Sequence, residues 1–197
     1  QVHEWAGLMA LFADKQRKLL TNAFLFDGPK ILLGKKLRGW RKGIHNGFGG
    51  KLEPGETVWE AGLRELEEEA GVRATDMRKV GIFTQTFIDK PSTLLEIHVF
   101  AVRAWDGTPQ TTDEMEPQWF THDKIPFDNM WKDDVVWFPF LLNNKKFVGH
   151  CHFDGDETML SHSFVEVTDN SLENWDESAP SEIHAAHFQI CLDKVAN

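Results

Sequence analysis

The stretch from Gly50 to Val72 constrains the fold of this 197-residue chain more than any other. Thr57 and Glu60 fit a helix capping box and Gly71 is placed to end the helix, so the sequence predicts a helix over residues 57–70. At about 100° per residue, the apolar side chains of this helix recur on one face, which we expect to be buried. These side chains are Trp59, Leu63, Leu66 and Ala70.

Three acidic side chains share a different face of this helix, because Glu65, Glu68 and Glu69 are spaced i, i+3 and i+4. Like charges at this spacing destabilise a helix by roughly 0.2–0.5 kcal/mol per pair, so something should compensate. One interpretation is a solvated acidic face, relieved by Arg64 and water. The other is a site for a hard cation, since a set of oxygen ligands suits Mg²⁺ or Mn²⁺.

The stretch resembles the Nudix box, the signature motif of the Nudix family. The matching positions are Gly50, Glu56, Arg64, Glu65, Leu66, Glu67, Glu68, Glu69, Ala70, Gly71 and Val72. In that family the motif forms a loop–helix–loop that binds divalent metal ions and hydrolyses a diphosphate linked to another moiety. The resemblance therefore implies the Nudix fold, an α/β fold in which a mixed β-sheet is sandwiched between helices.

The resemblance also implies roles for the residues of a catalytic site. Arg64 would orient a carboxylate of the motif, such as Glu56, through a charge-assisted pair. Glu65 or Glu69 would assist deprotonation of water, and the sequence does not separate the base from the ligands in so tight a cluster. The metal ligands would be one backbone carbonyl and four carboxylates, from Gly49, Glu65, Glu68, Glu69 and Glu114.

Four segments outside the helix resemble the animal MutT-homologue branch of this family. Members of that branch hydrolyse oxidised purine nucleoside triphosphates, such as 8-oxo-dGTP and 2-hydroxy-dATP, to monophosphate and pyrophosphate. Departures at His45 and Leu95, and a one-residue insertion within 82–95, leave the ranking among oxidised purines open. The four segments are residues 45–51, 113–120, 125–139 and 145–158, and the likeness covers about 21–167.

Four residues of these segments are candidates for recognising a purine, and each has an ordinary structural alternative. Asn46 offers a donor and an acceptor to a base edge, or it is a turn residue. Trp131 stacks on the purine, or it packs in the core. Asp133 and Asp134 read the purine edge with one ionised and one neutral carboxyl, or they place charge at a helix N-terminus. The resemblance implies these further residues of the nucleotide site: Thr21, Lys36, Trp40, Phe48, Gly49, Gly50, Lys51, Trp137 and Phe153.

The charge of the chain favours a small anionic ligand. A net charge of −10 argues against a nucleic-acid polymer, because such binding relies on neutralising many phosphates. A local excess of Lys and Arg over residues 35–51 suits a nucleoside triphosphate. No apolar run reaches the roughly 18 residues of a membrane span, and two cysteines without framework spacing suit a reducing compartment. We expect a monomer in the cytoplasm, and also in mitochondria or the nucleus.

Turn signals and apolar runs predict the remaining elements. The second helix is expected over 133–143, and an ordered binding loop over 34–50. This mixture of strands and two helices indicates an α/β fold with helices on the faces of a mixed sheet. The expected strands are 23–26 with 30–33, 77–88 with 94–103, 147–153 with 158–167, and a short strand at 118–121.

We expect three parts along the chain: an N-terminal extension (1–18), a Nudix hydrolase domain (19–167) and an acidic C-terminal extension (168–197). The last part carries six acidic groups and one Lys. Because residues 168–181 are acidic and poor in branched aliphatic side chains, we expect them to be loosely attached. A short helix is expected over 182–195.

Two other functions stay open at this point. One is hydrolysis of another Nudix substrate, such as ADP-ribose, a dinucleoside polyphosphate or an RNA cap, and Asn46, Trp131 and the paired aspartates argue against it. The other is nucleotide binding without catalysis, and the intact glutamates of the Nudix box argue against it.

Overall fold

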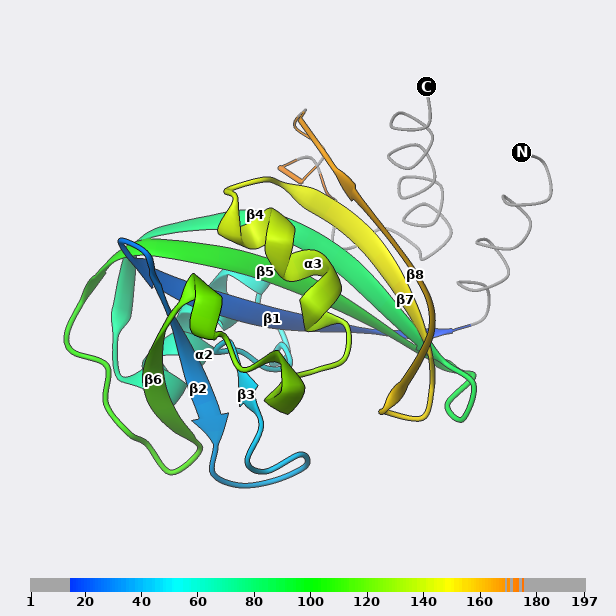
Figure 1. Ribbon diagram of the computed structural model, residues 1–197, viewed down its shortest axis with the longest axis horizontal. Helices are drawn as coiled ribbons and strands as arrows, with labels where there is room; N and C mark the ends of the chain where they lie inside the picture. Colours follow the sequence, from blue (N-terminus) through cyan, green and yellow to red (C-terminus); the bar gives the residue numbers. More distant parts are fainter. Residues whose placement is uncertain (1–14, 169, 171, 174, 176–197) are drawn as a thin grey trace.

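One mixed sheet organises the computed structural model, which describes residues 15–168, 170, 172, 173 and 175 (Figure 1). Its strand order is β3-β2-β1-β5-β4-β7-β8, and β6 pairs with β2. The pairs β1–β5 and β4–β7 are parallel and the other pairs are antiparallel, which confirms the predicted mixed sheet. The strands are β1 (Gln16–Asp27), β2 (Lys30–Lys36), β3 (His45–Asn46), β4 (Arg73–Phe87), β5 (Thr93–Asp106), β6 (Met115–Thr121), β7 (Phe147–Asp154) and β8 (Thr158–Glu166).

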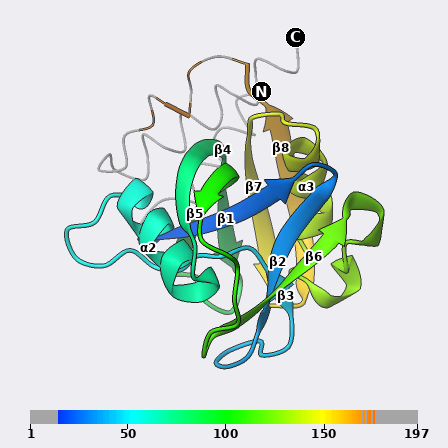
Figure 2. The same cartoon turned by 90° about the vertical axis from the view of Figure 1, so that its left-hand side faces the viewer.

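The helices α2 (Val58–Ala70) and α3 (Asp134–Leu142) cover opposite faces of this sheet (Figure 2). Side chains alternate along β1, so Ala23 and Leu25 join the core beneath α2, whereas Phe24 and Phe26 join the core beneath α3. The α3 core is rich in aromatic rings, with Trp137, Phe138 and Phe147 among its buried members. The predicted sandwich of a sheet between helices is confirmed.

The long strands begin earlier than the sequence indicates. β1 starts at Gln16, seven residues before the expected start at Ala23, because residues 16–25 pair in parallel with β5. Residues 16–18, which we assigned to an N-terminal extension, are therefore part of the sheet. β3 lies within the predicted binding loop, and two 3₁₀ turns, His122–Lys124 and Phe127–Asn129, precede α3.

The loop between β3 and α2 runs beside β1, and this placement builds the candidate site. Two isolated bridges, Leu20 with Lys51 and Ala23 with Phe48, hold the loop against the strand. A Cβ atom on Gly49 would overlap the backbone carbonyl of Thr21, so only glycine allows so close an approach. The glycines of this segment therefore set how near the loop lies to the sheet.

The beginning of the C-terminal segment packs against the domain. Leu172 and Trp175 are buried with Val167 in a cluster that includes Ile82, and the Trp175 indole Nε1 donates a hydrogen bond of 3.0 Å to the buried Glu96 Oε1. The expectation of a loosely attached segment is therefore wrong for these residues, because two apolar side chains dock an otherwise acidic stretch. The helix expected over 182–195 and most of the N-terminal extension lie outside the described residues.

Replacing Trp175 with alanine should lower the free energy of unfolding by about 3–5 kcal/mol, because the change removes a buried ring and leaves a cavity. Urea unfolding followed by circular dichroism would measure the loss. Trp119→Ala is the matched control, since that ring is 38% exposed and should cost much less. Equal losses for the two variants would show that Trp175 is not an anchor.

Candidate active site

The helix α2 begins and ends as the sequence predicts. The Thr57 side chain accepts a hydrogen bond from the Glu60 backbone (3.2 Å), the Glu60 carboxylate accepts one from the Thr57 backbone (2.9 Å), and Gly71 ends the helix at φ 71°. The buried face is rotated from the predicted one, because Trp59 is 43% exposed. Small residues allow the close approach to the sheet instead. The buried members are Val58, Ala61, Gly62, Leu66, Glu69 and Ala70.

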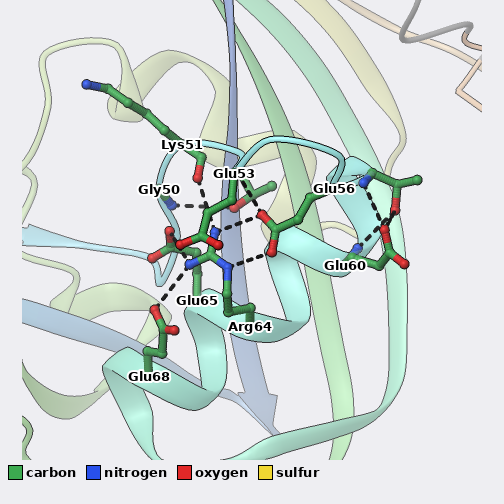
Figure 3. Close-up of polar contacts among 10 residues, drawn as sticks. Gly50, Lys51, Glu53, Glu56, Glu60, Arg64, Glu65 and Glu68 are labelled. Carbon is green, nitrogen blue, oxygen red and sulfur yellow. Dashed lines mark hydrogen bonds and ion pairs between the residues drawn. The ribbon is translucent and has the colours of Figure 1, made fainter.

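Arg64 joins the loop to the helix (Figure 3). Its guanidinium donates two hydrogen bonds to Glu56, of 2.7 and 3.0 Å, and one to the Lys51 carbonyl at 3.2 Å. It also donates to Glu65 (3.0 Å) and to Glu68 (3.1 Å). The Arg64 hydrogen bond, with a second from the Glu53 backbone, lowers the pKa of Glu56 to about 2. The pairing of Arg64 with Glu56 matches the predicted contact.

Glu69 is a nearly buried carboxyl at the junction of helix and loop. It is 7% exposed, and its Oε2 accepts a hydrogen bond of 2.8 Å from the Gly49 backbone. Burial raises the pKa of Glu69 to about 8; the Gly49 hydrogen bond opposes this rise and the Glu65 charge adds to it. A cation bound beside such a carboxyl would favour its ionised form and lower its pKa.

The Glu65 carboxylate also lies against the loop, next to Gly50. A Cβ atom on Gly50 would overlap the Glu65 carboxylate, so glycine is required here for contact between loop and helix. Burial raises the pKa of Glu65, while hydrogen bonding and attraction from Arg64 oppose the rise. Two carboxyls with raised pKa values therefore converge on the Gly49–Gly50 segment.

The donor chemistry of this cluster fits a hard divalent cation, although its side chains do not yet surround one point. Within the part of the chain that the structure describes, no three His, Cys, Asp or Glu residues form a ready metal site. Arg64 engages Glu65 and Glu68, and Arg38 forms an ion pair with Glu114, the fourth predicted carboxylate. All of these donors are oxygens, and burial raises the pKa values of Glu65 and Glu69, which a cation bound beside them would lower.

Three residues predicted to line the nucleotide site border this cluster. Lys36 ends β2, and its positive charge slightly opposes the rise in the pKa of Glu69. The Thr21 hydroxyl accepts a 3.4 Å hydrogen bond from the Gly50 backbone. Lys51 is exposed, and its backbone carbonyl is bound by Arg64.

Asp133 and Asp134 are buried at the start of α3, with exposures of 1% and 2%. Asp133 Oδ2 accepts hydrogen bonds from Gln85 Nε2 (2.9 Å) and Trp137 Nε1 (3.3 Å), and Asp134 Oδ2 accepts one from the Trp131 backbone (3.1 Å). Although Asp133 occupies the cap position, its side chain makes no capping hydrogen bond. The alternative of a simple helix-start role is therefore weakened.

The two aspartates share an environment that disfavours charge. Burial raises the pKa of Asp133 to about 6, with the Gln85 and Trp137 hydrogen bonds opposing the rise. Burial also raises the pKa of Asp134 well above its ordinary value, and the Asp133 charge adds to this effect. A neutral carboxyl donates a hydrogen bond that an ionised one cannot, so this pair can present both an acceptor and a donor.

Of the other predicted base-recognition residues, Trp131 precedes α3 and Asn46 is the last residue of β3. Trp131 packs against Trp40, with ring centroids 4.9 Å apart, and Trp40 is 57% exposed. Asn46 accepts a hydrogen bond of 3.1 Å from Asn22 Nδ2 on β1. We call Asn46, Trp131, Asp133 and Asp134 the base site.

Three aromatic residues that we predicted to line the nucleotide site are buried. Phe48 is fully buried beneath α2, and its backbone N–H and carbonyl both pair with Ala23, so it is a core residue and not a lining residue. Trp137 is fully buried, and its indole Nε1 donates a hydrogen bond to Asp133. Phe153 is 2% exposed and stacks on Phe87 in a small cluster.

Two residues that hold the base site were not predicted. Gln85 orients Asp133, and its position between Phe83 and Phe87 on an alternating strand was a signal that could have found it. Arg41 lies over the Trp131 ring and forms an ion pair with Glu157, which is 116 residues away in the sequence. No local pattern indicates so distant a contact.

These features define a protein that carries a loop–helix–loop of carboxylates on one face of a mixed sheet, and the chain belongs to the Nudix family. Residues 11–141 match the family model described as the NUDIX domain. Among the described residues, no helix is long and apolar enough to cross a membrane.

Two curated relatives cover most of the chain. An oxidized purine nucleoside triphosphate hydrolase from Danio rerio is 43% identical over 77% of this chain and 97% of that protein. The enzyme of the same name from Mus musculus is 43% identical over 76% and 96%. Among solved structures, the MutT protein from Bacillus halodurans superposes with a TM-score of 0.67 at 25% identity, covering 75% of this chain and 97% of that one.

Asp133→Asn should make stability less sensitive to pH between about 4 and 6. The folded pKa of Asp133, about 6, exceeds its ordinary value of 3.8, so the folded protein binds the proton more tightly than the unfolded chain. The stability that this group contributes is fully present below about pH 4 and is lost as the pH rises through about 6. The variant should gain roughly 1–3 kcal/mol relative to wild type over this interval, measured by urea unfolding.

Comparing the two proteins cancels the contributions of titrating groups that they share, such as Glu69 and His150. A difference in unfolding free energy that stays constant from pH 4 to pH 7 would contradict the assignment.

Proposed function

We propose that this chain is a pyrophosphohydrolase of oxidised purine nucleoside triphosphates, such as 8-oxo-dGTP and 2-hydroxy-dATP. It would release the monophosphate and pyrophosphate and so remove damaged precursors from the nucleotide pool. The identity of 43% to two oxidized purine nucleoside triphosphate hydrolases, over nearly their whole length, carries this proposal. The buried aspartate pair beside Trp131 gives it a chemical basis.

The cofactor in this proposal is Mg²⁺ or Mn²⁺, held by the Gly49 carbonyl and by the carboxylates of Glu65, Glu68, Glu69 and Glu114. When bound, the metal would neutralise phosphate charge and acidify a water molecule. Arg64 keeps Glu56 and Glu65 in place through three of its hydrogen bonds. Glu65 or Glu69 would accept the proton of the attacking water, and Lys36 and Lys51 would attract the triphosphate.

Base recognition in this proposal depends on different protonation states of the two aspartates. Asp133 already accepts two hydrogen bonds, from Gln85 and Trp137, so it would be the acceptor. Asp134 would be the neutral donor. Oxidation of guanine at C8 converts N7 from an acceptor to a donor, and an edge that offers both a donor and an acceptor can respond to that change.

The remaining proposals concern the setting of the enzyme. We propose a monomer that acts on a small-molecule nucleotide and not on a nucleic-acid polymer, which the net charge of −10 supports. We also propose a cytoplasmic location, shared with mitochondria or the nucleus. Cys151 is buried and free, which fits a reducing compartment.

Competitive hydrolysis tests the proposed function. The purified chain with Mg²⁺ would receive 8-oxo-dGTP, 2-hydroxy-dATP, O6-methyl-dGTP and dGTP together, and each monophosphate would be quantified. We expect an oxidised purine to be consumed before dGTP. Preference for dGTP, or turnover of none of the four, would refute the proposal.

Glu65→Gln should lower kcat at least about a hundredfold while the protein stays folded, because it removes one metal-binding charge from a half-buried position. Pyrophosphate release with saturating Mg²⁺ measures the loss, and the melting temperature checks the fold. Removing the metal with EDTA should abolish wild-type turnover. A kcat near the wild-type value in the variant would exclude Glu65 from the catalytic site.

Asp133→Asn and Asp134→Asn should change selectivity among purines more than metal dependence. A mismatched buried hydrogen bond costs about 1–3 kcal/mol, which is roughly ten- to a hundredfold in kcat/KM. Trp131→Ala should weaken all purine substrates evenly, since stacking tolerates differences at the base edge. Unchanged kcat/KM ratios for 8-oxo-dGTP over dGTP in both Asn variants would contradict the assignment.

A further inference from the structure

Arg41 has a backbone conformation that arginine rarely adopts. Its φ is 58°, in the left-handed region, and it lies in the β2–β3 loop between Gly39 and Gly43, which also have positive φ. A side chain in this conformation persists only where surrounding contacts hold it, and such positions gather at binding sites. The Arg41 side chain is only 13% exposed, so the loop turns it inward.

Arg41 and Asp134 together hold Trp131 at two points. The guanidinium carbon of Arg41 lies 4.5 Å from the centroid of the Trp131 ring, which is a cation–π contact. The backbone N–H of Trp131 donates to Asp134. The ring is therefore fixed by Arg41, and the backbone by a member of the base site.

The turn between β7 and β8 contributes two acidic side chains that form ion pairs near Trp131 and Trp40. Glu157 forms an ion pair with Arg41, and the neighbouring Asp156 pairs with Lys90 at 3.0 Å. Lys90 in turn lies 5.8 Å from the centroid of the Trp40 ring. Two adjacent carboxylates thus act on two cations, each of which faces one ring of the Trp40–Trp131 pair.

Two further observations concern the environment of Arg41, and the first places it near the base site. Its positive charge favours the ionised form of Asp134, which requires the two groups to be near each other. Its Nε is buried and has no hydrogen-bond partner among the described residues. Hydrogen bonding at Nε therefore does not account for the inward position of this side chain, whereas its contact with Trp131 does.

We propose that Arg41, tethered by Glu157, is a positioning residue that fixes the Trp131 indole for stacking on the purine. The inference rests on the proposed function, because that function assigns Trp131 to base stacking. A ring fixed before binding loses less conformational freedom when the base arrives, so affinity rises. The effect should be similar for different purines and should leave the hydrolytic step unchanged, because Arg41 is not among the carboxylate ligands.

A double-mutant cycle tests this inference with 8-oxo-dGMP and dGMP, monophosphates that the enzyme does not consume. Calorimetry would give Kd for wild type, Arg41→Met, Trp131→Ala and the double variant. Arg41→Met should raise Kd roughly three- to thirtyfold for both nucleotides, the range expected for loss of a cation–π contact. In the Trp131→Ala background the same change should alter Kd by less than about twofold, because the ring is gone.

Three further measurements and one control complete the test. Arg41→Lys, which keeps the charge, should restore part of the affinity, and Glu157→Gln should weaken binding less than Arg41→Met. The kcat of Arg41→Met for 8-oxo-dGTP should stay within about twofold of wild type. Lys145→Met is the control, since it removes another exposed ion pair, with Glu166, and should change neither constant.

Wild-type Kd values in Arg41→Met, or an equal rise in Kd with and without Trp131, would overturn the inference. A wild-type protein that binds the nucleotides without hydrolysing the triphosphates would refute the proposed function alone, because the binding cycle would still report on Arg41. A wild type that binds neither nucleotide would overturn both.

Discussion

The five hydrogen bonds of Arg64 are the interaction on which the candidate site depends. One planar guanidinium reaches the loop at Glu56 and Lys51 and the helix at Glu65 and Glu68. It offsets the repulsion of acidic groups within two helical turns, and it fixes the loop that carries Gly49 and Gly50. Lysine has neither the fork geometry nor enough donors to do this, so the position requires arginine.

Acidic side chains are buried both in the carboxylate cluster and in the base site, and their burial destabilises the fold. Glu69 beneath the loop and the pair Asp133–Asp134 beneath Trp131 have raised pKa values, and desolvation is the first cause in each. A core built for stability alone would place apolar side chains there. Such departures from local rules gather where a ligand supplies the missing partner, as a cation does for a carboxylate or a base edge does for a carboxyl.

The sequence predicted what local interactions determine and missed what distant contacts determine. The ends of α2 follow from Thr57 and Gly71, which act within one turn, and the mixed sheet follows from alternating strands. The buried face of α2 was wrong because the sheet accepts Ala61 and Gly62 closely, leaving bulky Trp59 outside. Likewise, Phe48 lies in a segment that resembles the family. The glycines of this segment allow the loop to approach β1 closely, whereas the Phe48 ring is buried in the core.

Contacts across the fold account for the remaining differences. The early start of β1 depends on parallel pairing with β5, and the docking of Trp175 depends on a buried Glu96 on a strand far back in the chain. Arg41 has the same character, since both its partners come from other segments. The excess of Lys and Arg over residues 35–51 indicated an anionic ligand. It did not show that Arg41 faces the Trp131 ring while other cations of this stretch face solvent.

β1 connects the two centres and keeps them at a set separation. Thr21 points to the α2 side, where it contacts Gly50, and Asn22 points to the α3 side, where it binds Asn46. Asn46 and Gly49 are three residues apart, so their backbones lie at most about 11 Å from each other. The base and the phosphates of a ligand that contacts both residues would therefore lie close together. Because the strand and the Gly-rich loop hold that spacing, the outer loops around Arg41 and Glu157 can change the affinity for a base while the carboxylate cluster stays in place.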